Sequence, residues 1–121
     1  MKRMVEGDCL KFQSEKKALE ISTSIENNTA IMRMSGAVTA DMGTDLKDEI
    51  LAFISMGKHV RLDFAQLEYI SSSAQNMLID VQSRYADRIG VDMEICRVPE
   101  KLYAQFRFSR LDTQLRIRRE E

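Results

Sequence analysis

Three consecutive hydroxyl side chains, Ser71, Ser72 and Ser73, form the most distinctive polar cluster in the sequence. They follow the strand-like segment 67–70 and precede apolar residues at helical spacing, so we expect them in the first turn of a helix. A serine there can accept a hydrogen bond from a free backbone N–H group. One hydroxyl could instead accept a phosphate, whose charge the free N–H groups and the positive end of the helix dipole would tolerate. The residues alone leave both interpretations open.

The other residues capable of chemistry do not form a recognisable catalytic or metal-binding motif. His59 is the single histidine, and no cysteine or serine nucleophile has a local signature that ties it to His59. Cys9 and Cys96 lack the spacing of a metal site, so we expect free thiols in a reducing compartment. The five glycines are dispersed and form no phosphate-binding loop. We therefore expect no enzyme activity, no cofactor and no metal.

Composition narrows the class of protein further. The chain of 121 residues is long enough for one hydrophobic core, and its 44% apolar and 31% charged residues are typical of a globular domain. Eighteen basic and nineteen acidic side chains give a net charge of -1, which disfavours nucleic acid as a partner. No apolar run approaches membrane-spanning length and no signal peptide is recognisable, so we expect a cytoplasmic protein without membrane contact.

The first half of the sequence predicts an arm followed by alternating strands and one helix. Residues 1–18 have no clear period and are expected to form an N-terminal arm of uncertain structure, followed by one domain over 19–121. Two strands joined by an Asn27-Asn28 turn follow, and Gly36 is expected to end the second. A helix is predicted over 41–56, with strands over 59–64 and, briefly, 67–70.

The second half predicts helices that alternate with strands. A helix should run from the serine cluster to Gly90, followed by a strand over 91–96 and a helix after Pro99. Leu102 and Phe106 mark the apolar face of that last helix, and Leu115 with Ile117 suggests a final short strand. This order predicts an α/β fold: a mixed sheet of about four to five strands packed against about three to four helices.

The run 60–74, VRLDFAQLEYISSSA, resembles the central signature of STAS domains, the family that includes anti-sigma factor antagonists. In that signature a strand ending in Asp leads through an apolar-aromatic pair to Asp-Ser-Ser/Thr-Gly at the start of a helix. The flanks are also similar to the family's pattern: Met34-Ser35-Gly36, the segment 90–96, Val98-Pro99, Leu111-Asp112, Leu115 and Ile117. The resemblance covers roughly residues 19–118.

The resemblance implies a protein-interaction domain that is switched by phosphorylation. In the family, such domains bind a serine kinase that is also an anti-sigma factor; phosphorylation breaks the complex, and a PP2C-type phosphatase restores it. Ser72 matches the phosphorylated serine of the family, with Ser71 and Ser73 as alternates. Two residues depart from the pattern, because Ser71 replaces the usual Asp and Ala74 replaces the usual Gly.

We expect the partner-binding surface to surround the start of this helix, and the protein to be a monomer or a weak homodimer. The predicted contact residues are Tyr69, Ser71, Ser72, Ser73, Gln75 and Asn76. An alternative hypothesis is a scaffold or accessory subunit of a signalling or transport complex that does not switch, with the serines acting only as a helix cap. A third is a domain that holds a small apolar or nucleotide ligand in a groove beside the sheet.

Overall fold

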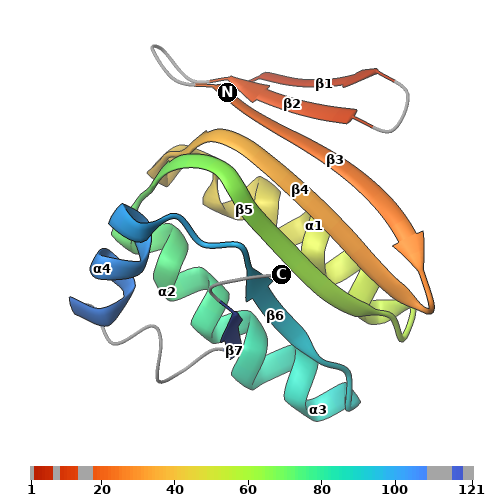
Figure 1. Cartoon of the computed structure of the whole chain (residues 1–121). Helices are drawn as coiled ribbons and strands as arrows, with labels where there is room; N and C mark the ends of the chain where they lie inside the picture. The colour runs from red at the N-terminus through yellow and green to blue at the C-terminus, as the bar shows by residue number, and fades with distance from the viewer. Residues whose placement is uncertain (1, 7–8, 14–17, 109–115, 119–121) are drawn as a thin grey trace.

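A single seven-stranded sheet organises the chain, and its strands lie side by side in the order in which they occur in the sequence (Figure 1). The computed structural model describes residues 2–6, 9–13, 18–108 and 116–118. Neighbouring strands from β1 to β4 are antiparallel, and those from β4 to β7 are parallel. The strands are β1 (Lys2–Glu6), β2 (Cys9–Gln13), β3 (Ala18–Glu26), β4 (Thr29–Val38), β5 (His59–Ile70), β6 (Met93–Cys96) and β7 (Arg116–Arg118).

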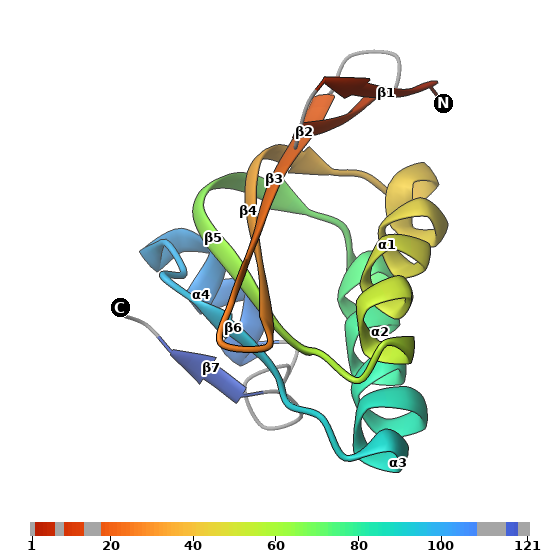
Figure 2. The same ribbon diagram turned by 90° about the vertical axis from the view of Figure 1, so that its right-hand side faces the viewer.

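The parallel strands are connected by helices, and α1 to α3 cover one face of the sheet (Figure 2). The helices are α1 (Gly43–Ser55), α2 (Ser72–Val81), the π-helical turn η2 (Gln82–Ala86), α3 (Asp87–Ile89) and α4 (Glu100–Phe108), with a 3-10 turn η1 (Ala40–Met42) before α1. The segments α2, η2 and α3 follow one another without a break. Helix α4 lies apart from this layer, on the other side of the sheet (Figure 2), where Phe106 contacts Phe64 of β5 with ring centroids 6.1 Å apart.

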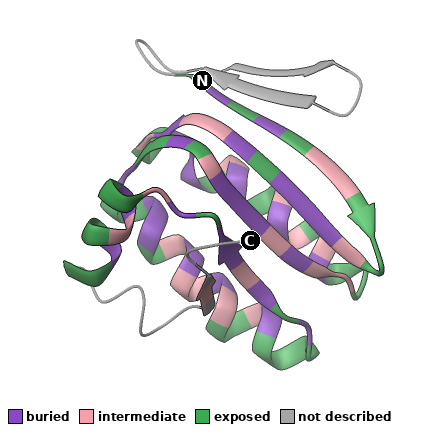
Figure 3. Ribbon diagram, viewed as in Figure 1, coloured by how far each residue is buried: buried purple, intermediate pink, exposed green. Residues whose placement is uncertain are grey.

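The hydrophobic core joins the sheet to the helical layer and also includes Leu102 and Phe106 of α4. Buried residues lie along both the central strands and the helices (Figure 3). Leu62 and Ile95 from the central strands and Leu46, Ile50 and Leu78 from α1 and α2 are completely buried. Burial of each such side chain stabilises the folded state by about 1.5–3 kcal/mol relative to leaving it exposed. These buried contacts therefore hold α2 in place on the sheet. Among the described residues, no helix is both long and apolar enough to span a lipid bilayer.

The structure confirms the predicted α/β class and most of the predicted connections. Asn27 and Asn28 form the turn between β3 and β4 with φ angles of 51° and 62°, the left-handed conformation that a tight hairpin turn requires. Gly57 follows the end of α1 with a φ of 76°. Gly90 ends the α2–α3 segment in the same left-handed region, with a φ of 89°.

The arm contains two strands that the sequence analysis did not resolve. Strands β1 and β2 pair with each other, and β2 pairs with β3, so they extend the predicted four to five strands to seven. The division of the chain at residue 18 remains a prediction.

Strand β5 is one continuous strand, although the sequence analysis predicted separate pieces over 59–64 and 67–70. Its register against β4 shifts by one residue between Asp63 and Gln66, and again between Leu67 and Tyr69. Each shift is a β-bulge that accommodates one extra residue without ending the pairing. The predicted break is therefore wrong.

Gly36 lies inside β4 at the second of these shifts, and it does not end the strand as predicted. Its φ is 99°, and a Cβ at this position would lie 2.2 Å from the Ala18 carbonyl oxygen. Glycine is required here because β3 passes too close for any side chain.

Several predicted boundaries move by a few residues. The helix predicted over 41–56 is α1, Gly43–Ser55, with η1 before it, because the chain first makes a tighter turn after β4. The strand predicted over 91–96 starts at Met93. The final strand is β7, while Leu115 lies outside the described residues, as do Leu111 and Asp112.

Candidate functional site

The serine cluster lies where the parallel strands β4 and β5 both end. Val38 and Ile70 pair at the ends of these strands, and the Ser71 N–H group donates to the Val38 carbonyl oxygen at 2.9 Å. The chain then turns into α2, while the chain from β4 turns into η1. Because carboxyl ends of parallel strands meet at one edge, the first turn of α2 lies beside the η1 turn.

Ser71 is the N-cap of α2. Its backbone is extended, with φ -71° and ψ 159°, and its Oγ accepts a hydrogen bond from the Ala74 N–H group at 3.1 Å. The same Oγ lies 3.2 Å from the Ser73 Oγ, and the residue is only 7% exposed. Ser71 therefore has a structural task that confirms the predicted helix start.

Ser72 differs from Ser71 in both exposure and bonding. It is the first residue of α2 and is exposed, and its hydroxyl makes no hydrogen bond to any described residue. Ser73 is also exposed, and its Oγ shares a hydrogen bond with Ser71. The first turn of α2 contains no acidic residue, so its free N–H groups have no competing carboxylate in that turn.

The remaining predicted contact residues divide between surface and interior. Tyr69 is 41% exposed at the end of β5, and Asn76 is exposed on α2. Gln75 is only 6% exposed, and its Nε2 donates to the Ile70 carbonyl oxygen at 3.3 Å. The exposed members of the predicted surface are thus Tyr69, Ser72, Ser73 and Asn76, whereas Ser71 and Gln75 support it from within.

An ion pair between the buried Asp63 and the half-exposed Arg97 lies on the path by which β5 reaches the cluster, and the sequence did not predict it. Asp63 is 6% exposed; its Oδ1 accepts from the Ala65 N–H group at 2.9 Å, within the first bulge. Its Oδ2 contacts the Arg97 Nη1 at 3.2 Å. Arg97 follows β6 with a φ of 57°. Asp63 belongs to the STAS-like run 60–74, which could have drawn attention to this carboxylate, but no sequence pattern indicated Arg97 as its partner.

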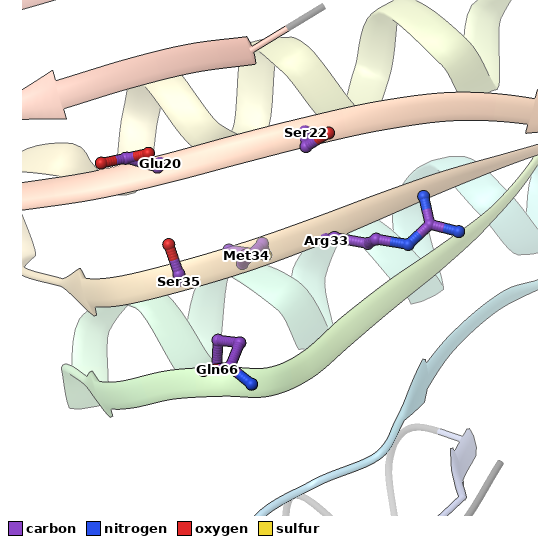
Figure 4. Close-up of a pocket in the computed structure, with 6 residues that line it drawn as sticks. All are labelled: Glu20, Ser22, Arg33, Met34, Ser35 and Gln66. Carbon is purple, nitrogen blue, oxygen red and sulfur yellow. The ribbon is translucent and has the colours of Figure 1, made fainter.

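The face of the sheet away from α1 and α2 carries a shallow hollow of 210 Å³ (Figure 4). Its lining comes from β3, β4 and β5: Glu20, Ser22, Arg33, Met34, Ser35 and Gln66. Pockets for drug-sized ligands usually measure about 300–1,000 Å³, so this hollow does not favour the small-ligand hypothesis.

His59, at the start of β5, has a structural role in linking two segments of the chain. Its Nδ1 accepts a hydrogen bond from the Asp92 N–H group at 3.0 Å, which links β5 to the segment before β6. Among the described residues, no group of three or more His, Cys, Asp or Glu side chains could hold a metal ion.

Comparison with protein families gives one decisive match. The model of the family described as "Mlab, STAS domain" matches residues 21–118. The chain belongs to the STAS domain family. This match confirms the resemblance of the run 60–74 to the STAS signature, while a comparison with curated proteins found no match.

Solved structures share the fold of this STAS domain at low sequence identity. An anti-sigma factor antagonist from Mycobacterium paratuberculosis is 12% identical with a TM-score of 0.69, and the alignment covers 83% of this chain and 85% of that one. The anti-sigma factor antagonist SpoIIAA in its unphosphorylated form is 15% identical with a TM-score of 0.67, over 80% and 86% of the chains. SpoIIAA of Bacillus in its phosphorylated form is 15% identical with a TM-score of 0.61, over 80% and 89%.

Proposed function

We propose that this STAS domain is a protein-binding module, not an enzyme, and that phosphorylation of Ser72 controls its binding. The observation that supports this most directly is the difference between two adjacent serines. Ser71 is buried and caps α2, whereas the Ser72 hydroxyl is exposed and makes no hydrogen bond to a described residue. A kinase could therefore modify Ser72 without removing the cap.

A phosphate on Ser72 would change the surface while leaving the fold intact. It would add a charge of about -1.5 to -2 at the start of a helix, where the free N–H groups and the helix dipole favour negative charge. A partner that packs against Tyr69, Ser72 and Asn76 would have to remove water from the charged phosphate, and this cost would favour dissociation of the complex. The phosphate therefore acts on binding, because α2 itself tolerates it.

The proposed partners rest on analogy with the proteins whose solved structures share this fold. Those proteins are anti-sigma factor antagonists, and SpoIIAA exists in unphosphorylated and phosphorylated forms. By analogy, the partner of the unmodified domain is a serine kinase that is also an anti-sigma factor, and a PP2C-type phosphatase reverses the modification. This role would place the protein in the cytoplasm, in the regulation of transcription.

Mass spectrometry of the protein from its native cells tests the modification. Trypsin should release the peptide 62–84, which contains Ser71, Ser72, Ser73 and Ser83, because no Lys or Arg lies between Arg61 and Arg84. We expect fragment ions that place the phosphate on Ser72. If the peptide is never phosphorylated under conditions that vary growth and stress, the domain is instead a scaffold or accessory subunit that does not switch.

Binding measurements on matched variants test the switch. We expect Ser72→Asp to raise the dissociation constant of the complex with the kinase partner at least about tenfold. The reason is that the new carboxylate would have to be desolvated in the contact. Ser83→Asp is the control: it places the same change at an exposed serine in η2, away from the first turn of α2. Equal weakening by both variants, or by neither, would contradict a switch at Ser72.

A further inference from the structure

The free edge of β1 presents five residues of strand that pair with nothing on their outer side within the described part of the chain. Such an edge is a template for pairing with another strand, and proteins protect it by shortening, covering or pairing it. The hairpin of β1 and β2 also extends past α1 at the top of both views (Figures 1 and 2). None of the described helices covers it there.

The hairpin lies outside the part of the chain that matches the family. The STAS family match begins at residue 21, after both strands. The hairpin nevertheless continues the sheet, because Leu10 of β2 pairs with Ile21 of β3, and Phe12 pairs with Leu19. Strand β2 is paired on both sides, whereas β1 is paired with β2 alone among the described strands, so a further strand on the outer side of β1 would satisfy that edge.

We propose that β1 is a homodimerisation strand, which pairs antiparallel with β1 of a second copy of this chain. If the two-fold axis passes through Met4, all five residues of each strand are paired. Lys2 of each copy then lies opposite Glu6 of the other copy. Arg3 then lies opposite Val5, and Met4 lies opposite its own symmetry mate. The two sheets become one, and neither β1 edge remains free.

Charge explains why the strand selects this arrangement. Opposite charges on directly opposed residues stabilise an antiparallel pair, and like charges destabilise it. In-register parallel pairing would set Lys2 against Lys2, Arg3 against Arg3 and Glu6 against Glu6. Of the two pairings that use all five residues of KRMVE, the antiparallel one is therefore the one that sets no like charges opposite each other.

A charge-swap series on the full-length protein tests this pairing by sedimentation velocity over a range of concentrations. We expect a dimer whose dissociation constant rises about tenfold in Lys2→Glu and in Glu6→Lys, because each change makes two symmetry-related pairs repulsive. The double variant restores opposite charges and should return to near the wild-type constant. A chain that stays monomeric at all concentrations, or a double variant weaker than both single variants, would overturn the proposal.

A disulfide at the symmetry axis tests the register itself, in a background with Cys9→Ser and Cys96→Ala. Directly opposed residues lie about 4.5–5.5 Å apart between Cα atoms, within the range of a disulfide. Met4→Cys should therefore cross-link two copies under mild oxidation. Val5→Cys is the control, because Val5 faces Arg3 of the second copy and lies too far from its own mate. Equal cross-linking of both variants would refute this register.

The proposal does not depend on Ser72. Its failure would leave the phosphorylation switch untouched, and the binding assays on Ser72 would be unaffected by a change in Lys2 or Glu6.

Discussion

Replacing Ser71 with alanine tests whether the serines at the start of α2 have separate tasks. The substitution removes the Oγ that accepts a hydrogen bond from the Ala74 N–H group at 3.1 Å. Ala74 is completely buried, so water cannot easily replace the lost partner. Loss of a serine N-cap costs about 1 kcal/mol, and an unsatisfied buried donor adds to this. We expect Ser71→Ala to lower the free energy of unfolding by about 1–2 kcal/mol.

Two companion variants separate the cap from the surface. Ser72→Ala removes an exposed hydroxyl without a described hydrogen-bond partner, so its free energy of unfolding should stay within about 0.5 kcal/mol of the wild type. Ser71→Asp should recover most of the stability lost in Ser71→Ala, because Asp and Ser are similarly good N-cap residues.

Urea unfolding followed by circular dichroism measures all three variants on the same scale. Equal slopes against urea would show that the comparison reflects stability and not a change in compactness. The reasoning is refuted if Ser72→Ala costs as much as Ser71→Ala, or if Ser71→Ala is as stable as the wild type. Either result would mean that α2 does not begin as described.

Four further substitutions, at three positions, have expected outcomes in the same unfolding assay. Gly36→Ala should destabilise by about 2–3 kcal/mol, because its Cβ would meet the Ala18 carbonyl oxygen and its φ of 99° is strained for alanine; a neutral result would contradict the close approach of β3. Arg97→Ala should cost about 1–2 kcal/mol by leaving the buried Asp63 without its cation, with an allowance for the half-exposed arginine. Arg97→Gly should be about 0.5–1 kcal/mol more stable than Arg97→Ala, since glycine suits a φ of 57°; the reverse order would argue against this backbone conformation. Phe106→Ala should cost about 3–5 kcal/mol through the cavity left by a fully buried ring, and an exposed ring would show almost no loss.

The sequence predicted those features of the fold that depend on local chemistry. The Asn27-Asn28 turn, the glycines after the helices and the serine cap each require a particular backbone conformation, and few residue types supply it. The start of α2, and with it the position of Ser72, could therefore be placed before the structure was available.

Features that depend on distant pairing could not be predicted in this way. Strand β5 stays paired with β4 across two register shifts, and the Ala65-Gln66 segment at the first shift interrupts the apolar alternation that marks a strand in the sequence. Strand β2 is defined by its pairing with β3, and β1 by its pairing with β2, while their own residues show no clear alternation. The Asp63–Arg97 pair joins positions 34 residues apart, with no spacing rule that connects them.

The strand order has a consequence for how the domain is made in the cell. Since every strand lies next to the one before it in the sequence, each new strand that leaves the ribosome finds its neighbour already synthesised. The sheet can grow steadily from one side to the other as translation proceeds, with each helix folding over strands already in place. The two-residue turn between β3 and β4 keeps the entropic cost of closing that hairpin small, whereas each parallel pair from β4 to β7 must wait for about twenty intervening residues to be made.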